Sequence, residues 1–207
     1  MSASTPAPTA SASLREVSGL PGTLPRLAES TLIMIDFQNT YRSGVMALEG
    51  AEQALAAAAR LLAAARAAGI PVVHVVNDGG EGTPYDIRAE IGAISPEVAP
   101  LEGEPVVVKQ VPNAFHATEL EKTLQQLGAG PDLVIAGFMT HMCVTFTAQG
   151  AFNLGYRPAV VAEATATRTL TAPDGSLVPA AALQAASLTT IADLFAPVAL
   201  TVDSLPA

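Results

Sequence analysis

Short apolar runs recur along most of the chain and set its pattern. Six runs of seven to nine residues are rich in β-branched and other apolar side chains, a composition typical of buried strands. Because these runs are apolar on both sides, they predict a sheet that is covered on both faces. The predicted strands are residues 31–37, 71–77, 105–111, 132–138, 157–165 and 196–202.

Segments with helical periodicity lie between the predicted strands. The first is rich in alanine and leucine and ends at Gly69, a residue type that commonly follows a helix. The second opens with Thr118 as its N-cap and Glu121 completing a capping box, and the third closes at Gly155. Strands that alternate with helices predict an α/β fold with a parallel sheet. The predicted helices are residues 53–68, 118–127, 143–154 and 180–194.

Three segments carry no such periodicity. Residues 1–13 are Ser, Thr, Ala and Pro with little large apolar surface, so we expect a flexible tail. Residues 14–30 predict an irregular lead-in that packs on the body of the protein. Residues 78–100 are rich in turn formers and form a longer connection than most, which is typical of functional or mobile segments. We find no internal repeat, so residues 14–207 are predicted to be one domain.

Composition narrows the class of protein and its partners. The 207 residues are 50% hydrophobic and 14% charged, which indicates a globular chain with a substantial core. The formal net charge of -9 and the lack of a basic cluster argue against nucleic acid and anionic membranes as partners. The single cysteine excludes an internal disulfide, and the N-terminus does not resemble a secretory signal. We therefore expect a cytoplasmic protein.

The single cysteine lies at a structurally special position. Cys143 stands where the predicted strand 132–138 gives way to a predicted helix. A cysteine in the first turn of a helix lies near unpaired backbone N–H groups and the positive end of the helix dipole, which favour the thiolate. Cys143 is thus a candidate nucleophile. The alternative is a small buried hydrophobic residue that has no chemical role.

Two of the predicted strands contain a charged residue that a buried sheet does not normally hold. Asp36 lies in LIMIDF and Lys109 in VVVKQV, both toward the carboxyl ends of their strands. Such residues are rarely buried unless they are paired, and the carboxyl edge of an α/β sheet is where ligands bind. Together with Cys143 they would support nucleophilic acyl transfer. The alternative places Asp36 in a turn and the Lys109 ammonium in solvent on an edge strand.

Several motifs resemble the isochorismatase-like cysteine hydrolases, the superfamily that includes nicotinamidase and N-carbamoylsarcosine amidase. The resemblance spans residues 31–200. The matching segments are IDFQN (35–39), VVVKQVPNAF (106–115), GFMTHMCV (137–144) with the following TAQGAFNLGY, and VVAEATATR (160–168). It implies a three-layer α/β/α fold with a six-stranded, mainly parallel sheet, and a homodimer or homotetramer.

The resemblance also implies the parts of an active site. Asp36, Lys109 and Cys143 would form a catalytic triad. A cis peptide bond would join Phe138 to Met139, and the N–H groups of Met139 and Cys143 would form an oxyanion hole, a preorganised pair of donors for a developing negative charge.

Candidates for the substrate pocket lie near these motifs. For Phe37 a place in the core is the alternative, for Gln38 a role in capping a loop, and for His141 a solvent-facing turn. The candidate substrate-binding residues are Phe37, Gln38, Tyr85, Phe115 and His141.

The sequence departs from nicotinamidases at the position of their metal motif. Those proteins carry Asp-x-His after the second strand, where this chain has VVNDGGEGTPYD. His74, His116 and His141 lack the spacing of metal ligands, so we predict no metal and no other cofactor.

The favoured hypothesis is a metal-independent hydrolase that cleaves an amide or carbamoyl C–N bond of a small molecule through a thioester on Cys143. One alternative is hydrolysis of the vinyl ether of isochorismate, which some relatives perform without the cysteine. The other is a thiol sensor or small-molecule binder on the same scaffold.

Overall fold

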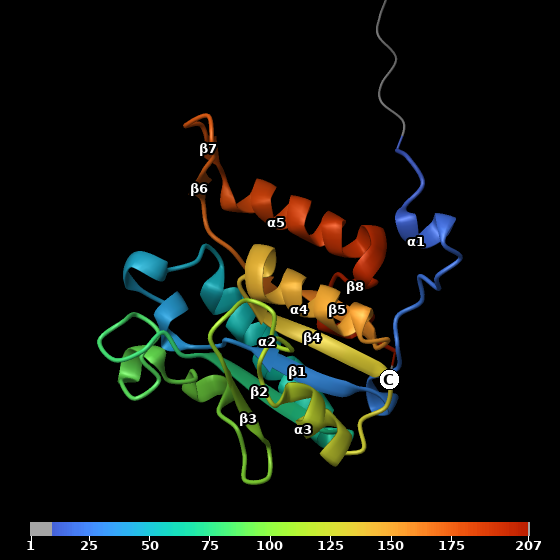
Figure 1. Cartoon of the computed structure of the whole chain (residues 1–207), viewed down its shortest axis with the longest axis horizontal. Coiled ribbons are helices and arrows are strands. Elements are labelled where there is room, and N and C mark those ends of the chain that lie inside the picture. Colours follow the sequence, from blue (N-terminus) through green and yellow to red (C-terminus); the bar gives the residue numbers. More distant parts are fainter. Residues whose placement is uncertain (1–9, 207) are drawn as a thin grey trace, which may run out of the picture.

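The computed structural model describes residues 10–206, and its centre is one six-stranded sheet (Figure 1). The strand order is β3-β2-β1-β4-β5-β8, and every neighbouring pair is parallel. The predicted parallel sheet and all six predicted strands are therefore confirmed. The strands are β1 (Thr31–Ile35), β2 (Val72–Asn77), β3 (Val106–Lys109), β4 (Asp132–Phe138), β5 (Arg157–Ala166) and β8 (Val198–Ala199).

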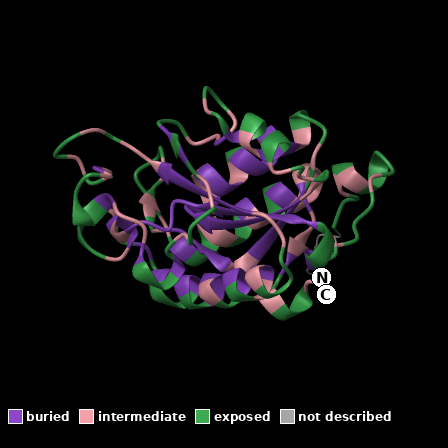
Figure 2. Ribbon diagram, turned by 90° about the horizontal axis from the view of Figure 1, so that it is seen from below, coloured by how far each residue is buried: buried purple, intermediate pink, exposed green. Residues whose placement is uncertain are grey.

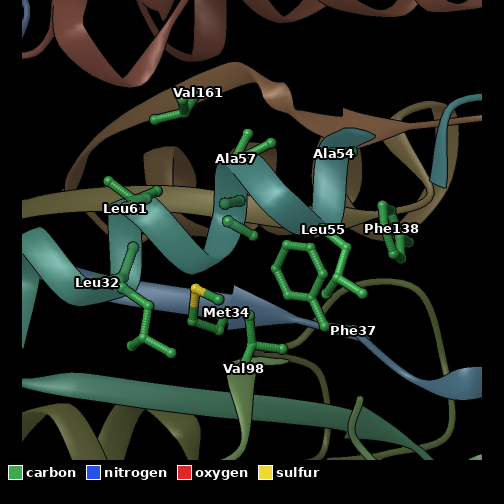
Figure 3. Close-up of a cluster of buried hydrophobic side chains, with 14 of the residues drawn as sticks. Leu32, Met34, Phe37, Ala54, Leu55, Ala57, Leu61, Val98, Phe138 and Val161 are labelled. Carbon is green, nitrogen blue, oxygen red and sulfur yellow. The ribbon is translucent and has the colours of Figure 1, made fainter. Parts of the chain in front are cut away.

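Helices cover both faces of the sheet, as the apolar strands require. On one face α2 (Ala51–Ala67) packs against Leu32 and Met34 of β1, and Figure 3 shows the leucines and alanines of this interface. On the other face lie α3 (Leu120–Gln126), α4 (Thr145–Asn153) and α5 (Ala180–Thr190). Ile33 and Ile35 point to that second face, because successive side chains of a strand alternate. Buried residues accordingly form a central layer between exposed outer surfaces (Figure 2).

The backbones of β1 and β4 approach closely near their carboxyl ends. Gly137 has φ +148°, and a Cβ atom at this position would lie 2.1 Å from the Ile35 carbonyl oxygen. Only glycine has the shape for this contact. The contact sets the distance between the two strand ends from which Asp36 and Cys143 project.

Two short elements were not expected from the sequence. The lead-in contains α1 (Leu14–Val17), which a capping box between Ser13 and Glu16 stabilises. A hairpin of β6 (Leu170–Thr171) and β7 (Leu177–Val178) projects beside α5 (Figure 1). Elements of two to four residues are too short to leave a periodic pattern. Of the predicted flexible tail over 1–13, residues 1–9 lie outside the described part of the chain.

The predicted start of α3 was wrong. The N-cap is Glu119, whose side chain makes no capping hydrogen bond, and Glu121 takes no part in a capping box. Thr118 instead donates its hydroxyl to the Ala114 carbonyl and accepts a hydrogen bond from Leu120 N–H. Ala117, with φ +54°, turns the chain just before this point, so that the helix begins later than the pattern indicated.

The connection between β2 and β3 contains two short 3₁₀ turns, Glu90–Gly92 and Pro96–Val98. It contains no helix or strand longer than these turns. This agrees with the lack of periodicity in residues 78–100. Within residues 10–206, no helix is long and apolar enough to cross a membrane.

A half-buried ionic cluster ties α2 to the edge of the sheet. The Glu104 carboxylate accepts two hydrogen bonds from Arg66, at 2.8 and 2.7 Å, and lies 3.0 Å from His74 Nε2. The Leu101 N–H donates a further hydrogen bond to Glu104. The paired guanidinium lowers the pKa of Glu104 to about 2, whereas burial lowers the pKa of His74, which is neutral at pH 7. His74 is thus a satisfied core histidine.

We predict that Glu104→Gln lowers the free energy of unfolding at pH 7 by about 2 kcal/mol, because it removes charge-assisted hydrogen bonds. Glu104 has a lower pKa in the folded protein than in the unfolded chain, so its contribution is present above the unfolded pKa. As the pH falls from there toward about 2, wild type loses this contribution and the difference between the two proteins shrinks. Urea unfolding at pH 7 and pH 3 measures both effects. Glu102→Gln, which changes an exposed neighbour, is the control and should leave stability unchanged.

Candidate active site

Polar side chains form a row along the carboxyl ends of the parallel strands. Asp36 follows β1, Lys109 ends β3, and Cys143 lies in the turn after β4. β1 and β4 are neighbours, and from them the chain builds the sheet outward in opposite directions. This edge therefore holds the topological switch point, where ligands bind in folds of this kind.

Asp36 occupies a sharp turn that ends β1 earlier than predicted. Its φ is +52°, a left-handed conformation in which aspartate is more common than most residues. Its N–H donates to the Val75 carbonyl of β2, and its own carbonyl accepts a hydrogen bond from Gln38 N–H at 2.7 Å. These bonds fix the residue at the strand end with its carboxylate fully buried.

The structure brings the three predicted residues into contact. Lys109 Nζ lies 2.7 Å from Asp36 Oδ2 and 3.3 Å from Cys143 Sγ. Both charged side chains are completely buried, and Cys143 is 7% exposed. Asn77 Oδ1, at the end of β2, accepts a further hydrogen bond from Lys109 Nζ at 3.3 Å. β3 is an edge strand, but its lysine points inward, so the alternative of a solvated ammonium was wrong.

The environment keeps the Cys143 thiol protonated at neutral pH. Burial, and then the negative charge of Asp36, raise the pKa of Cys143 to about 12, and Lys109 offsets only part of this. Burial also raises the pKa of Asp36. For Lys109, burial disfavours the ammonium, but the electrostatic attraction and hydrogen bonds of Asp36 and Cys143 together outweigh burial and leave the pKa raised. We assign a charged Asp36–Lys109 pair beside a neutral thiol.

The protonated Cys143 thiol differs from the thiolate that its position at the start of a helix predicted. Cys143 does lie in the turn that opens α4, as the pattern predicted. The predicted preference for thiolate was wrong for the free protein, because desolvation and the neighbouring carboxylate outweigh the helix dipole. A proton acceptor is therefore required before Cys143 can act as a nucleophile.

The turn after β4 has an unusual backbone. The Phe138-Met139 peptide bond is cis, at the position that the family resemblance implies. Thr140–Val144 form a single π-helical turn, and the Met139 carbonyl accepts hydrogen bonds from the N–H groups of Met142 and Val144. Met139 and Cys143 thus belong to one compact turn beside the Asp36–Lys109 pair.

Two of the five candidate substrate-binding residues lie at this edge. Tyr85 is half-buried, its ring packs against Tyr41, and it lies within electrostatic range of Asp36 and Cys143. His141 belongs to the same turn as Cys143, and its Nδ1 lies 2.6 Å from Thr167 Oγ1, just past the end of β5. It is half-buried, so the alternative of a solvent-facing histidine was wrong.

The other three candidates have structural contacts instead. Phe37 is buried in the core, with its ring 4.8 Å from that of Phe138. The Gln38 amide is fully buried and binds backbone atoms, donating to the Asn77 and Gly92 carbonyls and accepting from Asn77 N–H. Phe115 stacks on Tyr156, beyond the end of α4 that is remote from Cys143. We therefore place these three residues in the scaffold around the site.

Further residues of the site were missed from the sequence. Tyr41 is fully buried, interacts with Asp36 and Cys143, and has a raised pKa, first because of burial and then because of Asp36. Asn77 was included only as the last residue of a strand, and Arg168 only as the end of a motif. Polar residues at the end of a predicted strand, or within four positions after it, are the signal that could have identified them.

The long connection 78–100 is fixed to the segment that follows Asp36. The Thr40 hydroxyl donates to the carbonyls of Pro84 and Ile91, and the Asn39 amide donates to the Glu90 carbonyl. Together with the hydrogen bonds of Gln38, these bonds hold the connection, which carries Tyr85, beside the candidate site. Across residues 10–206, no three His, Cys, Asp or Glu side chains are grouped as a metal site would require.

Comparison with known proteins agrees with this architecture. Residues 30–202 match the isochorismatase domain. A crystal structure of an isochorismatase from Pseudomonas putida KT2440 has a TM-score of 0.90 and 40% identity, and the match covers 95% of this chain and 100% of that one. The uncharacterized isochorismatase family protein YddQ of Bacillus subtilis is 38% identical over 172 residues, which are 82% of this chain and 94% of YddQ.

Some relatives are named for their reactions. Streptothricin hydrolase of Streptomyces noursei is 36% identical over 72% of this chain and 55% of its own length. Maleamate amidohydrolase of Pseudomonas putida is 34% identical over 64% of this chain and 70% of its own length. The domain match spans most of the sequence, and the Pseudomonas putida crystal structure shares the fold. The chain therefore belongs to the isochorismatase family.

Proposed function

We propose that this protein is a hydrolase of a small-molecule amide or carbamoyl C–N bond that acts through a thioester on Cys143. The observation that carries the proposal is the buried contact among Asp36, Lys109 and Cys143, which unites a proton acceptor, a fixed positive charge and a nucleophile. The name of maleamate amidohydrolase supports the same reaction class, and that of streptothricin hydrolase supports hydrolysis.

Acylation begins with transfer of the thiol proton to Asp36 as the sulfur attacks the carbonyl carbon. The negative charge of the Asp36 carboxylate disfavours the Cys143 thiolate, so Asp36 contributes to catalysis by accepting the thiol proton. Lys109 stays charged and stabilises the negative charges that form during the reaction. The N–H groups of Met139 and Cys143 are the proposed donors to the oxyanion. Asp36 then gives its proton to the leaving nitrogen as the C–N bond breaks.

Deacylation uses the same groups. A water molecule attacks the thioester carbonyl and transfers a proton to Asp36, and the carbon–sulfur bond breaks to release the acid. Asp36 returns its proton to the sulfur, which restores the thiol. The balance is one water consumed for one amine and one acid released, and these three side chains suffice for the proton transfers.

Two observations favour this function over its rivals. A peroxide sensor needs an accessible cysteine of low pKa, whereas Cys143 is buried with a pKa of about 12. Vinyl-ether hydrolysis of isochorismate needs an acid but no nucleophilic sulfur, so it leaves the contact between Lys109 and Cys143 without a use.

We predict an acyl adduct on Cys143 during turnover of a panel of small amides, visible by intact-mass spectrometry. Cys143→Ala should abolish both the adduct and the turnover, and Asp36→Asn should lower kcat by about 10²- to 10⁴-fold, the usual contribution of a general base. Circular dichroism and thermal melts check that both variants are folded. Hydrolysis that persists in Cys143→Ala at the wild-type rate would show that catalysis is not covalent.

The assigned charges also predict the reactivity of the free thiol. Asp36→Asn should make alkylation of Cys143 by iodoacetamide faster at pH 8, because the thiolate then becomes the anion that pairs with Lys109. Lys109→Met should make it slower, and each unit of pKa change alters the thiolate fraction roughly tenfold. If the alkylation rate changed equally and in the same direction in both variants, Asp36 would not be the group whose negative charge raises the pKa of Cys143.

A further inference from the structure

A cavity of about 440 Å³ lies at the amino ends of β4 and β5, at the edge of the sheet opposite Cys143. Asp132, the first residue of β4, lines it, and the seven residues of this strand span roughly 20 Å to the turn that carries Cys143. Residues 20–26 of the lead-in line its other side (Figure 1). The volume is within the range of small-molecule sites, and the cavity is separate from the candidate active site.

Aromatic rings line this cavity. Phe152, near the end of α4, and Phe195, which ends the turn after α5, are half-buried, and their ring centroids lie 6.0 Å apart in an edge-to-face arrangement. Tyr156 lines the cavity as well and stacks on Phe115. Aromatic surfaces that are still partly exposed bind flat apolar groups, because both partners then lose contact with water.

The backbone around the cavity is stiff. The Arg15 guanidinium holds the lead-in by donating to the Leu194 carbonyl, at 2.7 Å, and to the Pro21 carbonyl. Prolines, whose φ is fixed, supply four of the lining residues. These are Pro21, Pro25, Pro158 and Pro197. A cavity formed in this way costs little conformational entropy when a ligand binds.

The charges that line the cavity leave one positive charge without a counter-ion. Three arginines and two acids line it, a surplus of one positive charge in a chain whose formal net charge is -9. Arg157 makes two hydrogen bonds to Asp132, at 2.8 and 2.6 Å. Arg26 lies 3.6 Å from Glu29. Arg15 is the lining arginine that has no carboxylate within 4 Å in the described part of the chain.

Arg15 is also poorly hydrated. The residue is half-buried, its Nε is buried without a hydrogen bond, and burial lowers the pKa of its guanidinium. Arginine nevertheless keeps its charge at neutral pH. A cation that is partly withdrawn from water and lacks a carboxylate partner is suited to bind an anion from outside the chain.

We infer that this cavity is a second ligand site and that it binds a small aromatic carboxylic acid. The aromatic ring packs against Phe152, Tyr156 and Phe195, and the carboxylate pairs with Arg15. The rings alone would accept any flat apolar molecule, and Arg15 alone would accept any anion. Their presence in one cavity selects a molecule that has both features. The inference does not rest on the proposed function.

The chain contains no tryptophan, so a single introduced tryptophan reports only on its own surroundings. Phe152→Trp places this reporter in the cavity, and Phe146→Trp, at an exposed position near the other end of α4, is the matched control. 3-Nitrobenzoate and 3-nitrobenzamide quench tryptophan fluorescence and differ only in carrying a carboxylate or an amide. We expect saturable quenching of Phe152→Trp, with affinity about tenfold higher for the acid, and only linear collisional quenching of Phe146→Trp.

Arg15→Met, combined with the Phe152→Trp reporter, should abolish this preference by weakening 3-nitrobenzoate alone, and Arg15→Lys should retain part of it. An equal loss of affinity for both ligands would mean that Arg15 only holds the lead-in, and it would overturn the inference. Arg60→Met is the control for charge, because Arg60 lies on α2 and pairs with Glu163. It should leave both affinities unchanged.

Other outcomes also overturn the inference. They are the absence of saturable quenching in Phe152→Trp, equal affinities for the acid and the amide, and saturable quenching of the same strength in Phe146→Trp. Affinity that falls as the protein concentration rises would show that a second copy of the chain covers the cavity instead. Cys143→Ala should bind 3-nitrobenzoate as tightly as the parent reporter protein, and loss of binding there would assign the quenching to the active site.

Discussion

The ion pair between Asp36 and Lys109 is the interaction on which the rest of the site depends. Both side chains are completely buried, and a charge in such a place is stable only when an opposite charge compensates it. Removal of either partner would leave the other uncompensated, at a cost of about 3 to 5 kcal/mol in comparable pairs. The pair therefore constrains both the fold and the chemistry.

The sheet supplies the geometry that this pair requires. Asp36 and Lys109 lie on strands separated by β2, so the lysine must reach across the end of β2, where Asn77 accepts a hydrogen bond from it. On the other side, Gly137 lets β4 approach β1 closely enough to bring Cys143 to the same carboxylate. Strand order, one glycine and one left-handed aspartate together define the position of Cys143 beside the ion pair.

Much of this arrangement could be predicted from the sequence, for physical reasons. Charged residues inside apolar runs are rare, so Asp36 and Lys109 were conspicuous, and a parallel sheet brings strand ends to one edge. Tyr41 and Arg168 lie beyond the strand ends, where no periodicity fixes the chain direction. Gln38 and Phe115 lie within the matching motifs, but their side chains contact backbone groups and the ring of Tyr156 instead.

Other properties of the site depend on quantities that a sequence pattern does not contain. The protonated state of Cys143 results from desolvation and from a carboxylate on another strand, which together exceed the local influence of the helix terminus. The start of α3 depends on the positive φ of Ala117, a backbone choice that alanine rarely makes. In both cases tertiary structure overrides a local preference.

The hydrogen bonds that hold the connection 78–100 affect which substitutions this fold can tolerate. Gln38, Asn39 and Thr40 hold residues 77–92 almost entirely through backbone carbonyls, which every amino acid provides. The Tyr85 side chain takes no part in these bonds, so it can be exchanged without loss of the anchors that hold the connection beside Asp36. Substrate range can diverge within one such lineage by substitution on a single loop, while the acid, the lysine and the thiol keep their positions.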